Sequence, residues 1–184
     1  SALRMVGNKA VYNGSYNFDK SIMVIRKTNI EDKVVNGMIL ERKRLDPEMQ
    51  LEVREPKIMI VKMDLKPVKE SWLKENTQYQ DILSMENDKL NKAKQIVDSI
   101  IATGANALLI ASPEVDQVVE DLLVAKRVFA VRISTEEIDY LSRYTGAKPV
   151  RLLEDLKKPH ILGRSQRIFE DEEDELIYVE NGSN

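Results

Sequence analysis

The sequence contains no cysteine and a single histidine among its 184 residues. The lack of cysteine excludes disulfide bonds and thiolate metal sites, and it fits a reducing compartment such as the cytoplasm. A histidine-based metal site or a Ser-His-Asp triad would have His160 as its only possible imidazole. We interpret His160 as a surface residue in a loop. We therefore expect no catalytic residue, metal or cofactor in this chain.

Aromatic side chains are also scarce, and neither sign of charge dominates. Aromatic residues make up 5% of the chain, and 28 basic residues face 31 acidic ones for a net charge of −3. Nucleic-acid binding calls for a concentrated basic face and stacking aromatics, so this composition argues against it. No apolar run approaches the roughly 20 residues of a membrane span. The 42% of hydrophobic residues suffices for the core of one domain over residues 1–184.

Motifs that bind phosphate or calcium are missing as well. Gly104 and Gly146 each follow a predicted helix, whereas a phosphate-binding fingerprint follows a strand. The acidic run at residues 170–175 lacks the glycine and the alternating spacing of a calcium loop. We interpret it as the turn of a hairpin.

Residues 90–132 predict the central unit of the fold. A helix with an apolar stripe ends at Gly104, and residues 107–111 form an apolar run typical of a strand buried on both faces. Ser112 and Pro113 are expected to cap and begin a second helix, which precedes another strand at 128–132. Helix, strand, helix and strand in this order indicate a right-handed parallel crossover.

The flanking segments predict further strands and one helix. A capping box of Ser134 and Glu137 starts a helix that ends at Gly146. Residues 42–56 carry two prolines without a stable period and are interpreted as a long loop. Residues 1–20 are interpreted as a loose strand or a hairpin at the domain edge. Strands are expected at residues 22–26, 37–41, 57–63 and 148–152, and in a hairpin that pairs 167–169 with 176–179. The predicted class is α/β, a parallel sheet backed by antiparallel strands.

Two segments allow two interpretations each. Residues 64–89 form either a surface loop folded onto the core or a projecting arm, and the helix after Ser112 presents either a solvated back or a binding face of mixed polarity. The arm would display Trp72, Leu73, Ile82, Leu83 and Met85 to a partner. The outer helix face carries Asp116, Gln117, Glu120, Asp121 and Lys126.

The order of the motifs resembles the apical domain of group II chaperonins, the archaeal thermosome and the eukaryotic TRiC/CCT complex. The resemblance runs from about residue 23 to residue 181. It rests on the segments IEDKVVNGMILERKRLDPEMQLEVREPKIMIVKMDL, IVDSIIATGANALLIAS, VAKRVFAVRISTEEIDYLSRYTGAKPV, DLKKPHILGRSQRI and LIYVEN. It implies a β/β/α sandwich with a parallel βαβ core and a helical protrusion, belonging to one subunit of an ATP-driven double ring in the cytoplasm.

The resemblance also implies where non-native polypeptides bind. The gripping elements would be the helix at 114–126, with Gln117, Glu120, Asp121 and Val124, and the loop at 45–53, with Leu45, Met49 and Leu51. Residues 65–89 would be a lid arm, which favours the projecting interpretation, and residues 1–21 an edge towards an intermediate domain. ATP and Mg would bind parts of the parent protein outside this chain, and sister subunits would complete the ring.

Several departures mark a divergent member and keep two alternatives open. The helix segment SPEVDQVVEDLL and the segment RISTEE differ from the family pattern. The chaperonin-like module of PIKfyve/Fab1 lipid kinases shares a run similar to KPHILG at residues 158–163. A small-ligand α/β domain would instead use strand ends near Ser112, Ser134 and Asn106.

Overall fold

The computed structural model describes residues 11–12, 15–16, 36–67, 79–112 and 114–182 of the chain. The predicted strand at 22–26 lies outside these residues. Within residues 1–20, predicted to be a loose strand or a hairpin, β1 (Val11–Tyr12) pairs antiparallel with β2 (Ser15–Tyr16).

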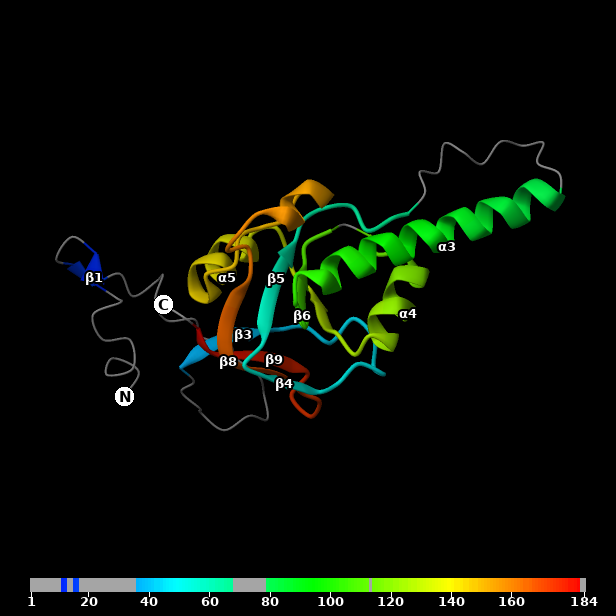
Figure 1. Cartoon of the computed structure of the whole chain (residues 1–184). Helices are drawn as coiled ribbons and strands as arrows, with labels where there is room; N and C mark the ends of the chain where they lie inside the picture. Colours follow the sequence, from blue (N-terminus) through cyan, green and yellow to red (C-terminus); the bar gives the residue numbers. More distant parts are fainter. Residues whose placement is uncertain (1–10, 13–14, 17–35, 68–78, 113, 183–184) are drawn as a thin grey trace.

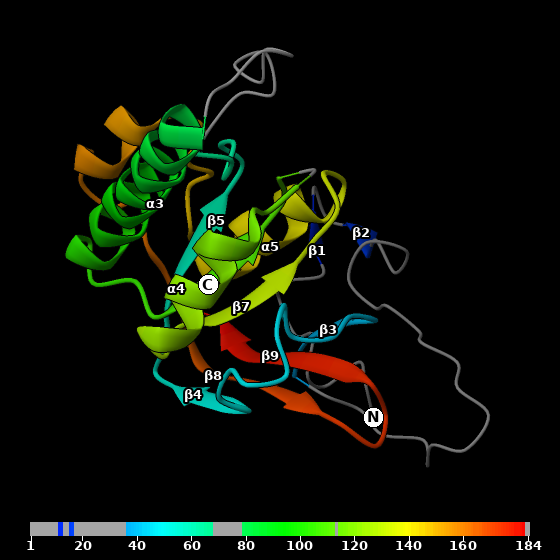
Figure 2. The ribbon, with the colours of Figure 1, turned by 90° about the vertical axis from the view of Figure 1, so that its right-hand side faces the viewer.

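Seven strands form one sheet in the order β3-β9-β8-β5-β6-β7, with β4 paired to β8. Strands β5, β6 and β7 are parallel, and β8 runs antiparallel to β5, β9 and β4. The strands are β3 (Gly37–Leu40), β4 (Glu52–Arg54), β5 (Lys57–Val61), β6 (Ala107–Ile110), β7 (Phe129–Arg132), β8 (Gly163–Asp171) and β9 (Leu176–Gly182). Figures 1 and 2 show β3, β9, β8 and β4 gathered below the parallel strands.

Helices cover both faces of the parallel strands. Figure 1 shows α3 (Tyr79–Ala102) and α4 (Gln117–Ala125) on one side and α5 (Glu137–Thr145) on the other. Two apolar cores result, one under α3 and α4, the other under α5 and the antiparallel strands. The predicted α/β sandwich with a parallel βαβ core is confirmed. None of the described helices is long and apolar enough to cross a membrane.

The central unit folds as its sequence predicts. All four residues of β6 are buried, and Leu109 lies between Ile60 of β5 and Val131 of β7 in the parallel register. Gly104 has φ +85°, a conformation that suits glycine at the end of a helix. Gly146 likewise ends α5 in the left-handed region, and the capping box of Ser134 and Glu137 is formed at its start.

The second helix begins later than predicted, because a different residue caps it. The Asp116 carboxylate accepts a hydrogen bond from the Val118 amide at 3.0 Å, and α4 starts at Gln117. Ser112 donates instead to the Glu114 carbonyl at 2.9 Å, and Val115 forms a bridge with Leu65. The prediction that Ser112 and Pro113 cap and begin the helix is therefore wrong, since Val115 forms a β-bridge and Asp116 is still extended.

Two further predictions need correction. Residues 42–56 are not loop throughout, because β4 lies among them and Val53 is buried opposite Ile168. Residues 148–152 form no strand: only Val150 bridges Val61, exchanging hydrogen bonds with Ile60 and Lys62. A 3₁₀ helix, η3 (Leu153–Lys157), follows this bridge in the chain.

Of the predicted arm, residues 79–89 belong to the first half of α3, and residues 68–78 lie outside the described residues. Leu65 and Pro67 are buried, and among the described side chains of α3 the first to reach the core is Ala93. Residues 79–92 span about 20 Å at the rise of an α-helix, and Figure 1 shows this part extending past the rest of the fold. Trp72 and Leu73 lie outside the described residues. Ile82, Leu83 and Met85 belong to the first turns of α3, but their side chains lie outside the described part.

Candidate functional site

The outer face of α4 combines polar and partly buried apolar side chains. Val119 and Leu123 point into the core and are fully buried. Gln117 and Asp121 are exposed, and the Gln117 amide donates to the Asp121 carboxylate at 2.9 Å. Glu120 and Val124 are half-buried between these two sets.

The loop at residues 41–51 covers the outer edge of the parallel sheet. The Leu45 amide donates to the Ala130 carbonyl at 2.8 Å, and Arg44 forms an antiparallel bridge with Val131 of the edge strand β7. Met49 is 3% exposed and packs into the core under α3 and α4, whereas Leu51 is 45% exposed. The loop thus closes an edge that would otherwise present unpaired backbone groups.

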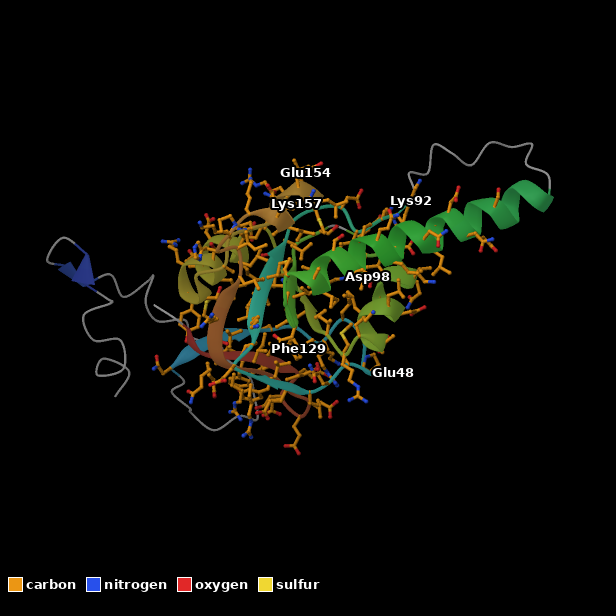
Figure 3. The ribbon with its side chains drawn as sticks, viewed as in Figure 1. Glu48, Lys92, Asp98, Phe129, Glu154 and Lys157 are labelled. Carbon is orange, nitrogen blue, oxygen red and sulfur yellow. The ribbon has the colours of Figure 1, made fainter. Side chains whose placement is uncertain are left out.

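Loop and helix meet to form one surface, which we call the α4–loop surface (residues 45–51 with Gln117, Glu120, Asp121 and Val124). The Gln50 side chain donates to the Arg127 carbonyl just after α4, at 2.9 Å. Burial raises the pKa of Glu120, the Asp46 carboxylate raises it further, and Arg132 opposes the shift. In Figure 3, Glu48 lies beside α4. The structure therefore brings the two predicted gripping elements together.

A buried ion pair fixes this loop, and sequence reasoning missed it. The Arg44 guanidinium binds the Glu170 carboxylate, and each side chain is only 5% exposed. The same guanidinium donates to the Met49 carbonyl within the loop and contacts Glu172 at 2.7 Å. Glu170 is 126 positions away in the chain, so no local spacing could have indicated the pair.

Salt bridges brace α4 against its neighbours. Lys89 of α3 contacts the capping carboxylate of Asp116 at 2.8 Å, and Lys126 contacts Asp98 of α3 at 3.5 Å. Figure 3 shows Asp98 on the part of α3 that faces α4. The helix is therefore fixed at both ends to the element that carries the projecting half.

A separate open pocket lies at the carboxyl ends of β6 and β7, and we call it the strand-end pocket. It has a volume of about 690 Å³, and seven residues line it, Ser112 and Ser134 among them. Asn106 lies at the opposite end of β6, where its side chain accepts a hydrogen bond from the Lys57 amide at 2.7 Å. The expectation that Asn106 shares a site with the two serines is therefore wrong.

The remaining candidates behave as surface features. His160 is exposed in a loop, as predicted. The acidic run crosses from β8 to β9 in a hairpin turn, with Asp171 paired to Leu176 and Glu175 bound to Lys43 at 2.7 Å. Within the described residues, no group of three or more histidine, aspartate or glutamate side chains could hold a metal ion.

Comparison with known proteins identifies relatives over the whole chain. The sequence pattern of the TCP-1/cpn60 chaperonin family matches residues 1–184. The chain is 30% identical over 193 aligned residues to thermosome subunit alpha of Aeropyrum pernix, which covers 100% of this chain and 34% of that subunit. It is 28% identical to a thermosome subunit of Methanothermococcus thermolithotrophicus, over 80% of this chain and 28% of that protein.

Solved structures share the fold. The open-state monomer of a group II chaperonin from Methanococcoides burtonii matches 82% of this chain and 32% of its own, with a TM-score of 0.60 and 19% identity. A group III chaperonin in the open state matches 86% of this chain and 32% of its own, with a TM-score of 0.63 and 16% identity. The chain spans about a third of the length of these relatives.

Proposed function

Because the chain belongs to the TCP-1/cpn60 chaperonin family, we propose that it is the apical domain of a divergent group II chaperonin subunit and binds non-native polypeptides. Membership of the family supports a chaperone role. The chain matches about a third of the thermosome subunits, which is the size expected of one domain of a larger subunit.

The observation that carries the proposal is the meeting of α4 with the loop. Gln50 ties the loop to the end of α4, and Met49 packs into the same core as Val119 and Leu123. The resulting surface offers partly exposed apolar groups, such as Leu51 and Val124, beside exposed polar ones. A non-native chain exposes apolar area that a native chain buries. A surface that combines exposed apolar groups with polar ones therefore suits broad, weak binding of such chains.

The projecting half of α3 supports a second proposal, that residues 65–89 form a lid arm. The described side chains of these turns, Ser84 and residues 86–88, are all exposed. A helix that leaves the core needs another surface to cover its apolar side chains. We propose that Trp72, Leu73, Ile82, Leu83 and Met85 provide contacts for a polypeptide or for neighbouring arms.

The same proposal extends to the parent protein. ATP and Mg would bind outside this chain, so the 184 residues alone would not hydrolyse ATP. Residues 1–21 would lead towards an intermediate domain. Sister subunits would form a cytoplasmic double ring around the bound polypeptide.

The test is suppression of aggregation of a chemically denatured protein by the 184-residue chain. Leu51→Ser should reduce the protection, because it removes the most exposed apolar group of the α4–loop surface. Leu153→Ser is the matched control, since Leu153 is 47% exposed on η3, away from that surface. Equal protection by both variants, or none by the parent chain, would contradict the proposal.

The lid arm is tested separately in the same assay. Serine replaces Trp72, Leu73, Ile82 and Leu83 together, and the protection is compared with that of the parent chain. A loss indicates that the arm takes part in binding. Unchanged protection removes the arm from the binding surface while leaving the α4–loop surface in place.

A further inference from the structure

The strand-end pocket carries positive charge although the chain as a whole is acidic. Its lining includes two arginines, Arg42 and Arg132, and three hydroxyl side chains, but no carboxylate. The net charge of the chain is −3. A hollow with this lining is therefore a local exception to the charge of the molecule.

The donors in the pocket are available to different degrees. In the part of the chain that the structure describes, no carboxylate lies within ion-pair distance of Arg132, which ends β7 and is exposed. Ser134 accepts a hydrogen bond from the Glu137 amide at 3.3 Å, so its own proton remains free to donate. Ser112 donates its hydroxyl proton to the Glu114 carbonyl, so it lines the pocket without offering a donor to a ligand. Thr135 is exposed at the rim, just before α5.

Two carboxylates lie near the arginines and would compete with an anionic ligand for them. Glu137 lies 3.6 Å from Arg42, but both side chains are partly exposed, and such a pair is worth little in water. Glu137 is also held by the Ser134 amide at 2.6 Å. Glu120 interacts with Arg132 only at longer range, and its burial, together with the nearby Asp46, disfavours its charged form. An incoming anion would thus compete with Glu137 for Arg42, whereas Arg132 has no ion pair among the described residues.

We propose that the strand-end pocket binds a phosphate group. Arginine presents a planar fork of donors that matches phosphate geometry, and hydroxyl donors complete the coordination from the other side. The amino end of α5 follows Thr135, but Glu137 and Asp139 in its first turn offset its partial positive charge, so the arginines supply the attraction. A volume of about 690 Å³ leaves room for a phosphate together with the group that carries it. The proposal does not depend on the α4–loop surface, which shares no residue with the pocket.

The test is a titration of the 184-residue chain with inorganic phosphate at constant ionic strength, followed by amide chemical shifts. We expect saturable binding, with the shifts concentrated at Arg42, Arg132 and Thr135. Arg132→Gln should weaken the binding about tenfold, because it removes one charge-assisted contact. The affinity of Arg132→Lys should lie between those of the parent chain and Arg132→Gln, since lysine keeps the charge but lacks the planar fork of donors.

Arg164→Gln is the matched control. Arg164 is exposed on β8, opposite Lys57 at the other end of β5, and should leave the affinity unchanged. Melting curves of all variants verify that each is folded. Absence of saturable binding, or equal losses in Arg132→Gln and Arg164→Gln, would overturn the proposal.

A second arm identifies the source of the phosphate. A short peptide is titrated with and without a phosphate on its serine. Tighter binding of the phosphopeptide than of inorganic phosphate indicates a ligand attached to a polypeptide, whereas equal affinity indicates a free phosphate ligand. Equal binding of the two peptides would contradict the assignment, because the phosphate would then contribute nothing.

Discussion

The parallel layer and the loop at residues 41–51 hold their shapes by opposite means. Strand β6 is apolar and buried at every position, between two strands of similar composition. The loop depends on one buried cation, Arg44, which binds Glu170 and the Met49 carbonyl. Many small apolar contacts stabilise the first region, whereas the second adds a few strong polar contacts to the single buried apolar side chain of Met49.

This difference determines how each region fails. Removing one side chain from an apolar layer takes away a fraction of its contacts and leaves a cavity. Removing one partner of a buried ion pair leaves the other charge without solvent and without a counter-ion. Because the loop forms half of the α4–loop surface, its failure should also abolish binding, which failure of a single core position would not.

The largest effect is therefore expected for Arg44→Met. Glu170, 5% exposed, would remain buried without its partner, and the free energy of unfolding should fall by about 3–5 kcal/mol. Urea unfolding measures the loss. The double variant Arg44→Met/Glu170→Met should recover much of the stability, because no isolated charge remains. If the single variant is as stable as the parent chain, the loop is not held by this pair.

Leu109→Ala probes the apolar side of the comparison. Leu109 is fully buried in the core beneath α5, so the free energy of unfolding should fall by about 2–4 kcal/mol. Leu152→Ala, at a residue 61% exposed, should change it by less than about 0.5 kcal/mol.

Arg44→Met and Leu109→Ala together separate the effect on stability from the effect on binding. At a temperature where both remain folded, Leu109→Ala should still suppress aggregation, whereas Arg44→Met should not. A parallel loss in both variants would mean that the loop contributes to binding only through global stability.

The comparison also explains which features the sequence predicts. The strand at 107–111 and the turn at Gly104 were predicted because an apolar run and a glycine at a helix end are local signals. Strand β4 was missed because it is three residues long and is stabilised by pairing with β8, more than 100 positions away. Arg44 gave no signal for the same reason.

The candidate site was predicted in its elements but not in its geometry. The resemblance to chaperonins points to α4 and the loop, yet only the structure reveals that Gln50 joins them. In the strand-end pocket, Ser112 and Ser134 follow strands, as a site at strand ends requires, whereas Asn106 precedes one. Arg42 and Arg132 were missed, because charge on a strand end is indistinguishable from an ordinary solvated side chain without the fold.

Asp116→Ala tests the helix start that the sequence misassigned. Loss of the carboxylate removes the hydrogen bond to the Val118 amide and the contact with Lys89, and unfolding should become easier by about 1 kcal/mol. Asp121→Ala on the same helix is the control, since Asp121 is exposed and caps nothing. Equal effects would indicate that general charge, and not capping, stabilises α4.

The smallest effect is expected at Asp155, a polar contact that is open to water. Its carboxylate accepts hydrogen bonds from the Arg151 and Leu152 amides at 2.9 and 3.0 Å, and Lys158 contacts it at 2.6 Å. These partners, Lys158 first, lower the pKa of Asp155 from 3.8 to about 2. A lowered pKa means that the folded state favours the charged form of Asp155. Its contribution to the stability of the fold is therefore complete above the ordinary pKa of 3.8 and is lost as the pH falls through about 2. The thermal unfolding of Asp155→Asn and of the parent chain should therefore differ at neutral pH and converge in acid, and a carbon-detected NMR titration should place the Asp155 midpoint well below 3.8. Titration at the ordinary value would mean that water competes successfully for this exposed turn, in contrast to the buried pair at Arg44.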